Sequence, residues 1–235
     1  MAIKICLDAG HYGKYNRSPA VKTYYESDMN WKLHLLLKTE LESYGIEVIT
    51  TRADKDTDLG LQARGKKSKG CDLFISIHSN AVGSSVNESV DYPVVYVPIS
   101  GKADAIGNKL ADCVTKQMGT KQKGYINKRK GSGEWDYYGV IYGATSVGVP
   151  GIIIEHSFHT NTRSTNWLLN DANLAKLAKA EAEVIASHYG LKKNEPATGK
   201  WYRVQIGAYQ YEENAKKTLE KAKAAGFTDA YIKYD

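Results

Sequence analysis

The stretch IKICLDAGH, residues 3–11, indicates how this protein folds. Its first five residues form a short run rich in β-branched and apolar side chains, which is typical of a buried strand. The run gives way to Asp8, Ala9, Gly10 and His11, a change that predicts a loop carrying functional residues. We therefore expect a buried strand whose carboxyl end lies beside a functional loop.

Two later stretches end in the same way. Residues 72–78 form a strongly apolar strand that ends at His78, and residues 151–154 form a strand followed directly by Glu155. The second strand contains three consecutive isoleucines, which suggests burial on both of its faces. In sheets of parallel strands, ligands bind outside the carboxyl ends. His11, His78 and Glu155 are therefore expected to converge.

Between these strands, segments whose apolar residues recur at helical spacing alternate with further apolar runs typical of strands. Strands alternating with helices predict an α/β fold, a twisted and mostly parallel sheet flanked by helices. The helices are expected at 28–44 with Ser27 as N-cap, 59–69, 103–118 and 173–189, and the remaining strands at 46–51, 94–98 and 137–141.

A change in composition marks a domain boundary after Gly190. Residues 1–190 are expected to form the main domain, and residues 191–200 form a polar linker with a proline and a glycine. Residues 201–235 then predict a small βαβ unit, with strands at 201–206 and 229–234 around a helix at 212–225. A unit of this size can hardly bury a core by itself.

Composition limits the class of protein. The formal net charge of +6 favours anionic polymers, but no helix-turn-helix, zinc-finger or RNP-like pattern supports nucleic-acid binding. No segment approaches the ~20 apolar residues of a membrane span. The N-terminus leads directly into the first strand without a signal-peptide core, so we expect a protein made in the cytoplasm.

Two histidines and one carboxylate are a common ligand set for catalytic zinc. Asp8 could orient a ligand histidine through a hydrogen bond. His156 and His159 are alternative candidates for metal binding or proton transfer. Alternatively, Glu26 could have only a structural role, because a negative charge stabilises the positive N-terminus of the first long helix. Burying a carboxylate directly after three isoleucines costs free energy unless the carboxylate is paired or has a function. This cost favours a functional role for Glu155. Glu155, Ser157 and His159 should share one face of an extended segment.

Four motifs carry a family resemblance: DAGH after the first strand, a glutamate before the first long helix, SIHSN after a buried strand, and IIIEHSFHTN. Together they resemble the zinc-dependent N-acetylmuramoyl-L-alanine amidases of the Amidase_3 family. The resemblance implies that zinc is bound by His11, Glu26 and His78, and that Glu155 is the catalytic residue. It implies hydrolysis of the amide between N-acetylmuramic acid and L-alanine in peptidoglycan.

The substrate residues are less well defined by the resemblance. Members of the family commonly carry glycine where this chain has Ser157, which bears on peptide preference. Candidates for the substrate groove are Asn80, Phe158 and Asn161.

Residues 201–235 resemble one half of a sporulation-related repeat (SPOR) domain, a type of domain that binds wall glycans. We expect two chains to pair through this segment as a homodimer, because a lone half leaves an apolar face and an open edge. The absence of a signal peptide ahead of the catalytic motifs fits a phage endolysin that acts on the cell wall after release. The alternatives are a bacterial autolysin or sporulation amidase, or a non-catalytic wall-binding protein with the same fold.

Overall fold

The computed structural model of the protein describes residues 2–193, 205–227 and 230–234. The chain divides into two compact units, Met1–Asn194 and Glu195–Asp235. Each unit is described by itself.

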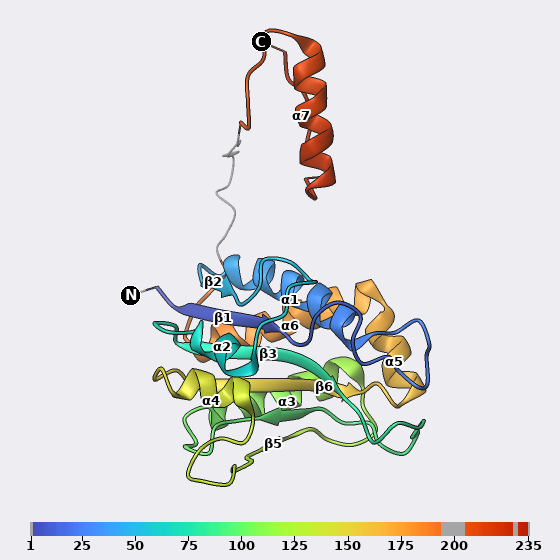
Figure 1. Ribbon diagram of the computed structural model, residues 1–235, viewed down its shortest axis with the longest axis vertical. Helices are drawn as coiled ribbons and strands as arrows, with labels where there is room; N and C mark the ends of the chain where they lie inside the picture. The colour runs from blue at the N-terminus through green and yellow to red at the C-terminus, as the bar shows by residue number, and fades with distance from the viewer. Residues whose placement is uncertain (1, 194–204, 228–229, 235) are drawn as a thin grey trace. The chain divides into compact units, whose positions relative to one another are not determined.

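The first unit is built on one sheet of six strands in the order β2-β1-β3-β6-β4-β5 (Figure 1). All neighbouring strands are parallel except β4 and β6, which are antiparallel. The predicted α/β fold with a mostly parallel sheet is therefore confirmed. The strands are β1 (Lys4–Ala9), β2 (Glu47–Thr50), β3 (Leu73–Asn80), β4 (Val94–Tyr96), β5 (Tyr125–Asn127) and β6 (Gly151–Phe158).

Helices cover both faces of this sheet. One face packs on α1 (Glu26–Glu42), α3 (Asp104–Met118) and α6 (Asp171–His188). The other face packs on α4 (Gly139–Thr145), and α2 (Leu61–Lys66) packs in turn on α4. Successive strand side chains point to opposite faces. In β6, Ile152 and Ile154 accordingly join the larger core cluster and Ile153 the smaller one. The three isoleucines are thus buried on both faces, as the sequence predicted.

The strand predicted at 137–141 is wrong, because α4 occupies Gly139–Thr145. Two glycines explain the difference. A Cβ on Gly143 would lie 2.3 Å from the carbonyl oxygen of Gln62, and one on Gly65 would lie 2.1 Å from that of Val140. These contacts let α2 and α4 pack backbone to backbone, and this tertiary contact overrides the local preference of the tyrosine-rich segment for a strand.

Other boundaries also differ. The sequence did not predict β5 or the short helix α5 (Thr162–Leu169). Helix α1 begins at Glu26, so Ser27 lies in its first turn and does not cap it. The Ser27 hydroxyl instead donates to the carbonyl of Gly13 (2.9 Å) and accepts from the amide of Tyr15 (2.8 Å). The early start makes Glu26 the first helical residue.

In the second unit, α7 (Glu212–Ala224) confirms the predicted helix. The described parts of the two predicted flanking strands, residues 205–206 and 230–234, form no strand, and the rest of those predictions lies outside the described residues. Within the described residues, no helix is long and apolar enough to cross a bilayer.

Candidate metal centre

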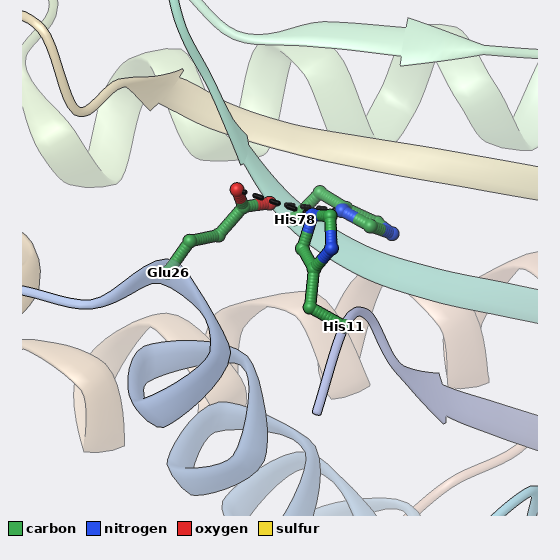
Figure 2. A group of neighbouring side chains, drawn as sticks. All are labelled: His11, Glu26 and His78. Carbon is green, nitrogen blue, oxygen red and sulfur yellow. Dashed lines mark hydrogen bonds and ion pairs between the residues drawn. The ribbon is translucent and has the colours of Figure 1, made fainter. Parts of the chain in front are cut away.

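Three side chains from separate elements meet at the carboxyl end of the sheet (Figure 2). His11 follows β1, Glu26 opens α1, and His78 lies in β3. Each offers one nitrogen or oxygen atom, and these three atoms lie within 4.8 Å of one another. We call these residues the triad. The structure thus brings together the three residues for which the sequence predicted metal binding.

Glu26 is the buried centre of the triad. Its Oε1 lies 2.9 Å from Nδ1 of His78 and accepts from the amide of Ser79 (3.1 Å), while its Oε2 lies 3.3 Å from Nε2 of His11 and accepts from Asn16 (2.7 Å). Burial acts to raise the pKa of Glu26, but the hydrogen bonds from His11 and His78 outweigh it and hold the pKa well below its usual range. Glu26 is therefore an ionised carboxylate between two imidazoles.

The backbone at His11 is held in an unusual conformation. His11 has φ 59°, in the left-handed region that few residues other than glycine adopt. Arg64 donates to the carbonyls of Ala9 (3.0 Å) and His11 (3.2 Å) and so fixes this turn. Gly10 is required beside it, because a Cβ there would lie 2.2 Å from the His78 ring. The close approach of the two chain segments places both imidazoles beside Glu26.

A chain of hydrogen bonds determines which nitrogen of His78 faces Glu26. Asp8 is paired with Arg64 (3.2 Å), and its carboxylate accepts from Ser76 Oγ (2.7 Å). The Ser76 hydroxyl has one proton to give, so it accepts from Nε2 of His78, at 3.1 Å. With Nε2 donating to Ser76, Nδ1 of His78 faces Glu26, and the position between them can hold either the proton of a hydrogen bond to Glu26 or a metal cation. Asp8 therefore orients His78 through Ser76, rather than by the direct hydrogen bond that the sequence suggested.

Glu155 lies beside the triad, opposite His78 in the pairing of β6 with β3. Its Oε2 is buried and has no hydrogen-bond partner among the described residues. Burial, and then the negative charge of Glu26, raise the pKa of Glu155 well above its usual range. An unpaired buried carboxyl group of this kind is typical of a functional residue.

The two histidines that flank Glu155 have other partners. The buried His156 donates from Nδ1 to the carbonyl of His78 (2.9 Å), and its Nε2 lies 2.8 Å from Oε1 of Glu181 on α6. His159 Nδ1 lies 3.0 Å from the hydroxyl of Ser79 and 4.0 Å from Oε2 of Glu26. His156 thus supports the backbone of His78, and His159 packs behind Glu26.

Ser157 interrupts the alternation of side chains along β6. The register with β3 shifts between His78 and Asn80, and Ser157 has φ 59°. Its hydroxyl donates to the buried Asp91 (2.8 Å), away from the triad. The expectation that Glu155, Ser157 and His159 share one face is therefore wrong, because one extra residue in the bulge turns Ser157 aside.

The three candidates for the substrate groove lie in different surroundings. Asn80 is partly exposed and accepts from the amide of Ala81 (2.8 Å). Phe158 is buried against Tyr92, and Asn161 is buried and caps α5 by accepting from the amide of Ser164 (3.0 Å). Substrate contact by these three residues stays a prediction.

Helix-flanked sheets with polar side chains gathered at the strand ends define the class of α/β enzymes. Within this class, residues 5–187 match the family model Amidase_3, N-acetylmuramoyl-L-alanine amidase. The chain belongs to this family of peptidoglycan amidases. A second match, to the SPOR domain, covers residues 171–233.

Individual relatives agree with the family. The chain is 27% identical to the N-acetylmuramoyl-L-alanine amidase CwlM of Bacillus licheniformis, over 99% of this chain and 85% of the relative. It is 30% identical to the endolysin of Bacillus phage SPP1, over 82% of this chain and 68% of that protein. The catalytic domain of the amidase CwlV from Bacillus (Paenibacillus) polymyxa var. colistinus has a similar fold, with a TM-score of 0.67 and 23% identity over 81% of this chain and 99% of that domain.

Proposed function

We propose that this amidase uses one zinc ion, held by His11, Glu26 and His78, to hydrolyse the amide between N-acetylmuramic acid and L-alanine. The observation that carries the proposal is the triad itself, three donor atoms within 4.8 Å beside an unpaired buried carboxyl group. Two imidazoles and one carboxylate suit zinc, and three protein ligands leave a fourth position for water or substrate.

The described residues fit a divalent cation in three ways. Glu26 is ionised, the hydrogen-bond chain through Ser76 leaves the lone pair of His78 Nδ1 directed at Glu26, and Glu155 carries a raised pKa nearby. A positive charge at the triad would stabilise the ionised form of Glu155 and lower its pKa. A cation would thus relieve the repulsion between the two carboxyl groups.

When bound, zinc supplies a Lewis acid that polarises the amide carbonyl and lowers the pKa of water to ~7. We assign to Glu155 the proton transfers. It accepts a proton from the attacking water and passes it to the nitrogen of the departing L-alanine, as a general base and then a general acid. A neutral amine leaves more easily than an amide anion. We expect replacement of Glu155 by glutamine to lower kcat by roughly 10²- to 10⁴-fold.

Zinc content tests the ligand assignment independently of activity. We expect the purified full-length protein to retain one zinc ion per chain after dialysis, and His78→Ala to retain none. His188→Ala, at the end of α6 and outside the triad, is the matched control and should retain the metal. A His78→Ala protein that keeps zinc as tightly as the control would contradict the assignment.

The biological role that we propose is that of a phage endolysin, made in the cytoplasm and released to the wall at lysis. The likeness to the endolysin of Bacillus phage SPP1 supports this role. A bacterial autolysin or sporulation amidase is the alternative, supported by the likeness to CwlM. Expression in a host with and without a phage pore protein separates the two, because an endolysin should lyse the cells only when the pore is present.

For the second unit we propose wall binding and pairing of two chains. The SPOR match begins at residue 171, on α6, whose Leu177 and Ile185 are buried in the amidase core. The part of the match after the linker is therefore the part that we assign to the second unit. Ile206, Phe227 and Tyr231 are each more than half exposed in this unit, and a second copy could cover them. Light scattering that shows only monomer across a range of concentrations would refute pairing.

A further inference from the structure

A cavity of about 330 Å³ opens beside the triad, and His11 and His78 form part of its lining. The remaining wall comes from β1 and the loop after it, from α2 and the residues just before it, and from Val140 on α4. A molecule that fills this cavity therefore contacts two of the three triad residues. The cavity is continuous with the candidate metal centre, and the chemistry of its wall indicates which part of a substrate it receives.

One wall of the cavity is aromatic. Tyr12 and Tyr15 are 40% and 49% exposed, and their ring centroids lie 6.3 Å apart at an interplanar angle of 24°. The Tyr15 ring stacks in turn on His11, at 4.7 Å and 18°. Three nearly parallel rings thus lead away from the triad. We call Tyr12 and Tyr15 the tyrosine wall.

The loop that carries the tyrosine wall is held in place by the protein itself. The amide of Gly13 donates to the carbonyl of Lys55 (2.8 Å), and the hydroxyl of Ser27 bonds to the backbone of both Gly13 and Tyr15. Groups positioned before the ligand arrives lose less conformational entropy on binding. The tyrosine wall therefore has the properties of a formed binding surface.

The lining of the cavity offers no free positive charge. Arg64 is the one cation among the described residues that line it, and its side chain is only 3% exposed. Its guanidinium donates to Asp8, to Asp58 and to the carbonyls of Leu59, Ala9 and His11. Arg64 is thus occupied, so the described lining residues include no free lysine or arginine side chain to pair with the carboxylates of a stem peptide.

Asp58 provides an acceptor at the rim of the cavity. Its side chain is 57% exposed, and its Oδ1 accepts from Arg64 (3.1 Å) and from the amide of Leu59 (2.7 Å). Its Oδ2 accepts no hydrogen bond from the described residues. Exposed aromatic faces together with an open acceptor suit an uncharged ring that has apolar C–H faces and hydroxyl groups, which is the chemistry of a sugar.

We propose that this cavity is the glycan subsite of the enzyme: the muramic acid ring stacks on Tyr12 and Tyr15, and one of the glycan hydroxyls donates to Asp58. The inference rests on the proposed function, which places the scissile amide at the triad, one lactyl group away from the sugar ring. The stem peptide then leaves the triad on the side away from the tyrosine wall.

Binding to full-length, ¹⁵N-labelled Glu155→Gln protein tests the subsite without turnover. The probes are the peptide-free disaccharide of N-acetylglucosamine and N-acetylmuramic acid, and the free tripeptide L-Ala-D-Glu-L-Lys. We expect the disaccharide to shift the amide resonances of residues 10–16, which separates binding in the cavity from binding by the second unit. Tyr12→Ala and Tyr15→Ala should each weaken that binding roughly tenfold, with tripeptide binding unchanged. Tyr12→Phe should retain it, because the ring remains.

Tyr125→Ala is the matched control, since Tyr125 is 46% exposed on β5 and does not line the cavity. It should leave disaccharide binding unchanged. Loss of tripeptide binding in the Tyr12 and Tyr15 variants would place the peptide in the cavity and overturn the proposal. Failure of the disaccharide to shift residues 10–16, or unchanged binding in both variants, would also overturn it. Cleavage of cell walls by the wild-type protein is measured separately, so loss of the glycan subsite and loss of the amidase function are distinguishable outcomes.

Discussion

Replacing Ser76 by alanine should weaken zinc binding by roughly 10- to 100-fold, the usual effect of removing a partner that orients a metal ligand. The hydroxyl of Ser76 lies 3.1 Å from Nε2 of His78 and 2.7 Å from Oδ2 of Asp8. Without it, the His78 ring can rotate, and either ring nitrogen can carry the proton. The expected loss corresponds to about 1.4 to 2.8 kcal/mol of binding free energy.

The fold should survive this substitution. Asp8 keeps its hydrogen bond from Thr51 (2.5 Å) and its ion pair with Arg64 (3.2 Å). The substitution removes two hydrogen bonds, to Asp8 and with His78, each worth about 1 kcal/mol of unfolding free energy. Ser68→Ala is the matched control, because Ser68 is equally buried but its hydroxyl donates to the carbonyl of Gly65, away from the triad. Ser68→Ala should bind zinc as the wild type does.

Asp8→Asn should weaken zinc binding more than Ser76→Ala does. Oδ1 of Asp8 accepts from Thr51 and Arg64, so the amide oxygen of an asparagine should remain there and its NH₂ group should face Ser76. Ser76 would then accept from the asparagine and donate to Nε2 of His78. That reversal would place the His78 proton on Nδ1, the atom assigned to zinc.

Competition with a chromogenic zinc chelator measures these affinities, and circular dichroism confirms that each variant is folded. The expected order of affinity is wild type and Ser68→Ala, then Ser76→Ala, then Asp8→Asn. A folded Ser76→Ala protein whose zinc affinity is indistinguishable from that of the control would refute the orienting role of the hydrogen-bond chain.

Three further predictions follow from the same structure. Removal of metal with a chelator should abolish amide cleavage and zinc should restore it, because the triad alone provides no Lewis acid; activity that survives chelation would contradict this. Burial lowers the pKa of His34 from 6.5 to about 4, so the unfolded state takes up the proton first as pH falls. The unfolding free energy should therefore decrease by about 3 kcal/mol in total as the pH falls from 6.5 to 4. Denaturant titrations should show that the unfolding free energy of His34→Gln depends less on pH than that of the wild type. Equal dependence on pH in the two proteins would exclude His34 as the cause. Gly143→Ala should lower the unfolding free energy by about 1–3 kcal/mol, because its Cβ would lie 2.3 Å from the carbonyl of Gln62; an unchanged melting curve would show that α2 and α4 can separate without cost.

The sequence predicted the sheet well where burial alone determines the structure. The strands before His11, His78 and Glu155 are apolar runs of the right length, and parallel pairing brings their ends together. The segment at 137–141 failed because contacts with α2, which are distant in sequence, determine its conformation. Helix α5 was missed because its N-cap, Asn161, was interpreted as a substrate residue.

The sequence predicted which residues form the candidate metal site, but it could not predict how their side chains are oriented. In the sequence, Ser76 is one polar residue within an apolar strand. Only the structure shows that its hydroxyl is hydrogen-bonded to both Asp8 and His78. The tyrosine wall was missed for a similar reason, since Tyr12 and Tyr15 lie in a loop without periodicity. Tyrosines next to the metal-site motif were the available signal.

Mass spectrometry of cell walls digested with the wild-type protein and with Glu155→Ala identifies the bond that the protein cuts and the residue that cuts it. Wild-type protein with zinc should release new L-alanine amino termini, and Glu155→Ala should release none. New reducing sugar ends, or equal release of L-alanine termini by the variant, would contradict the assignment of an amidase centre to the triad and Glu155.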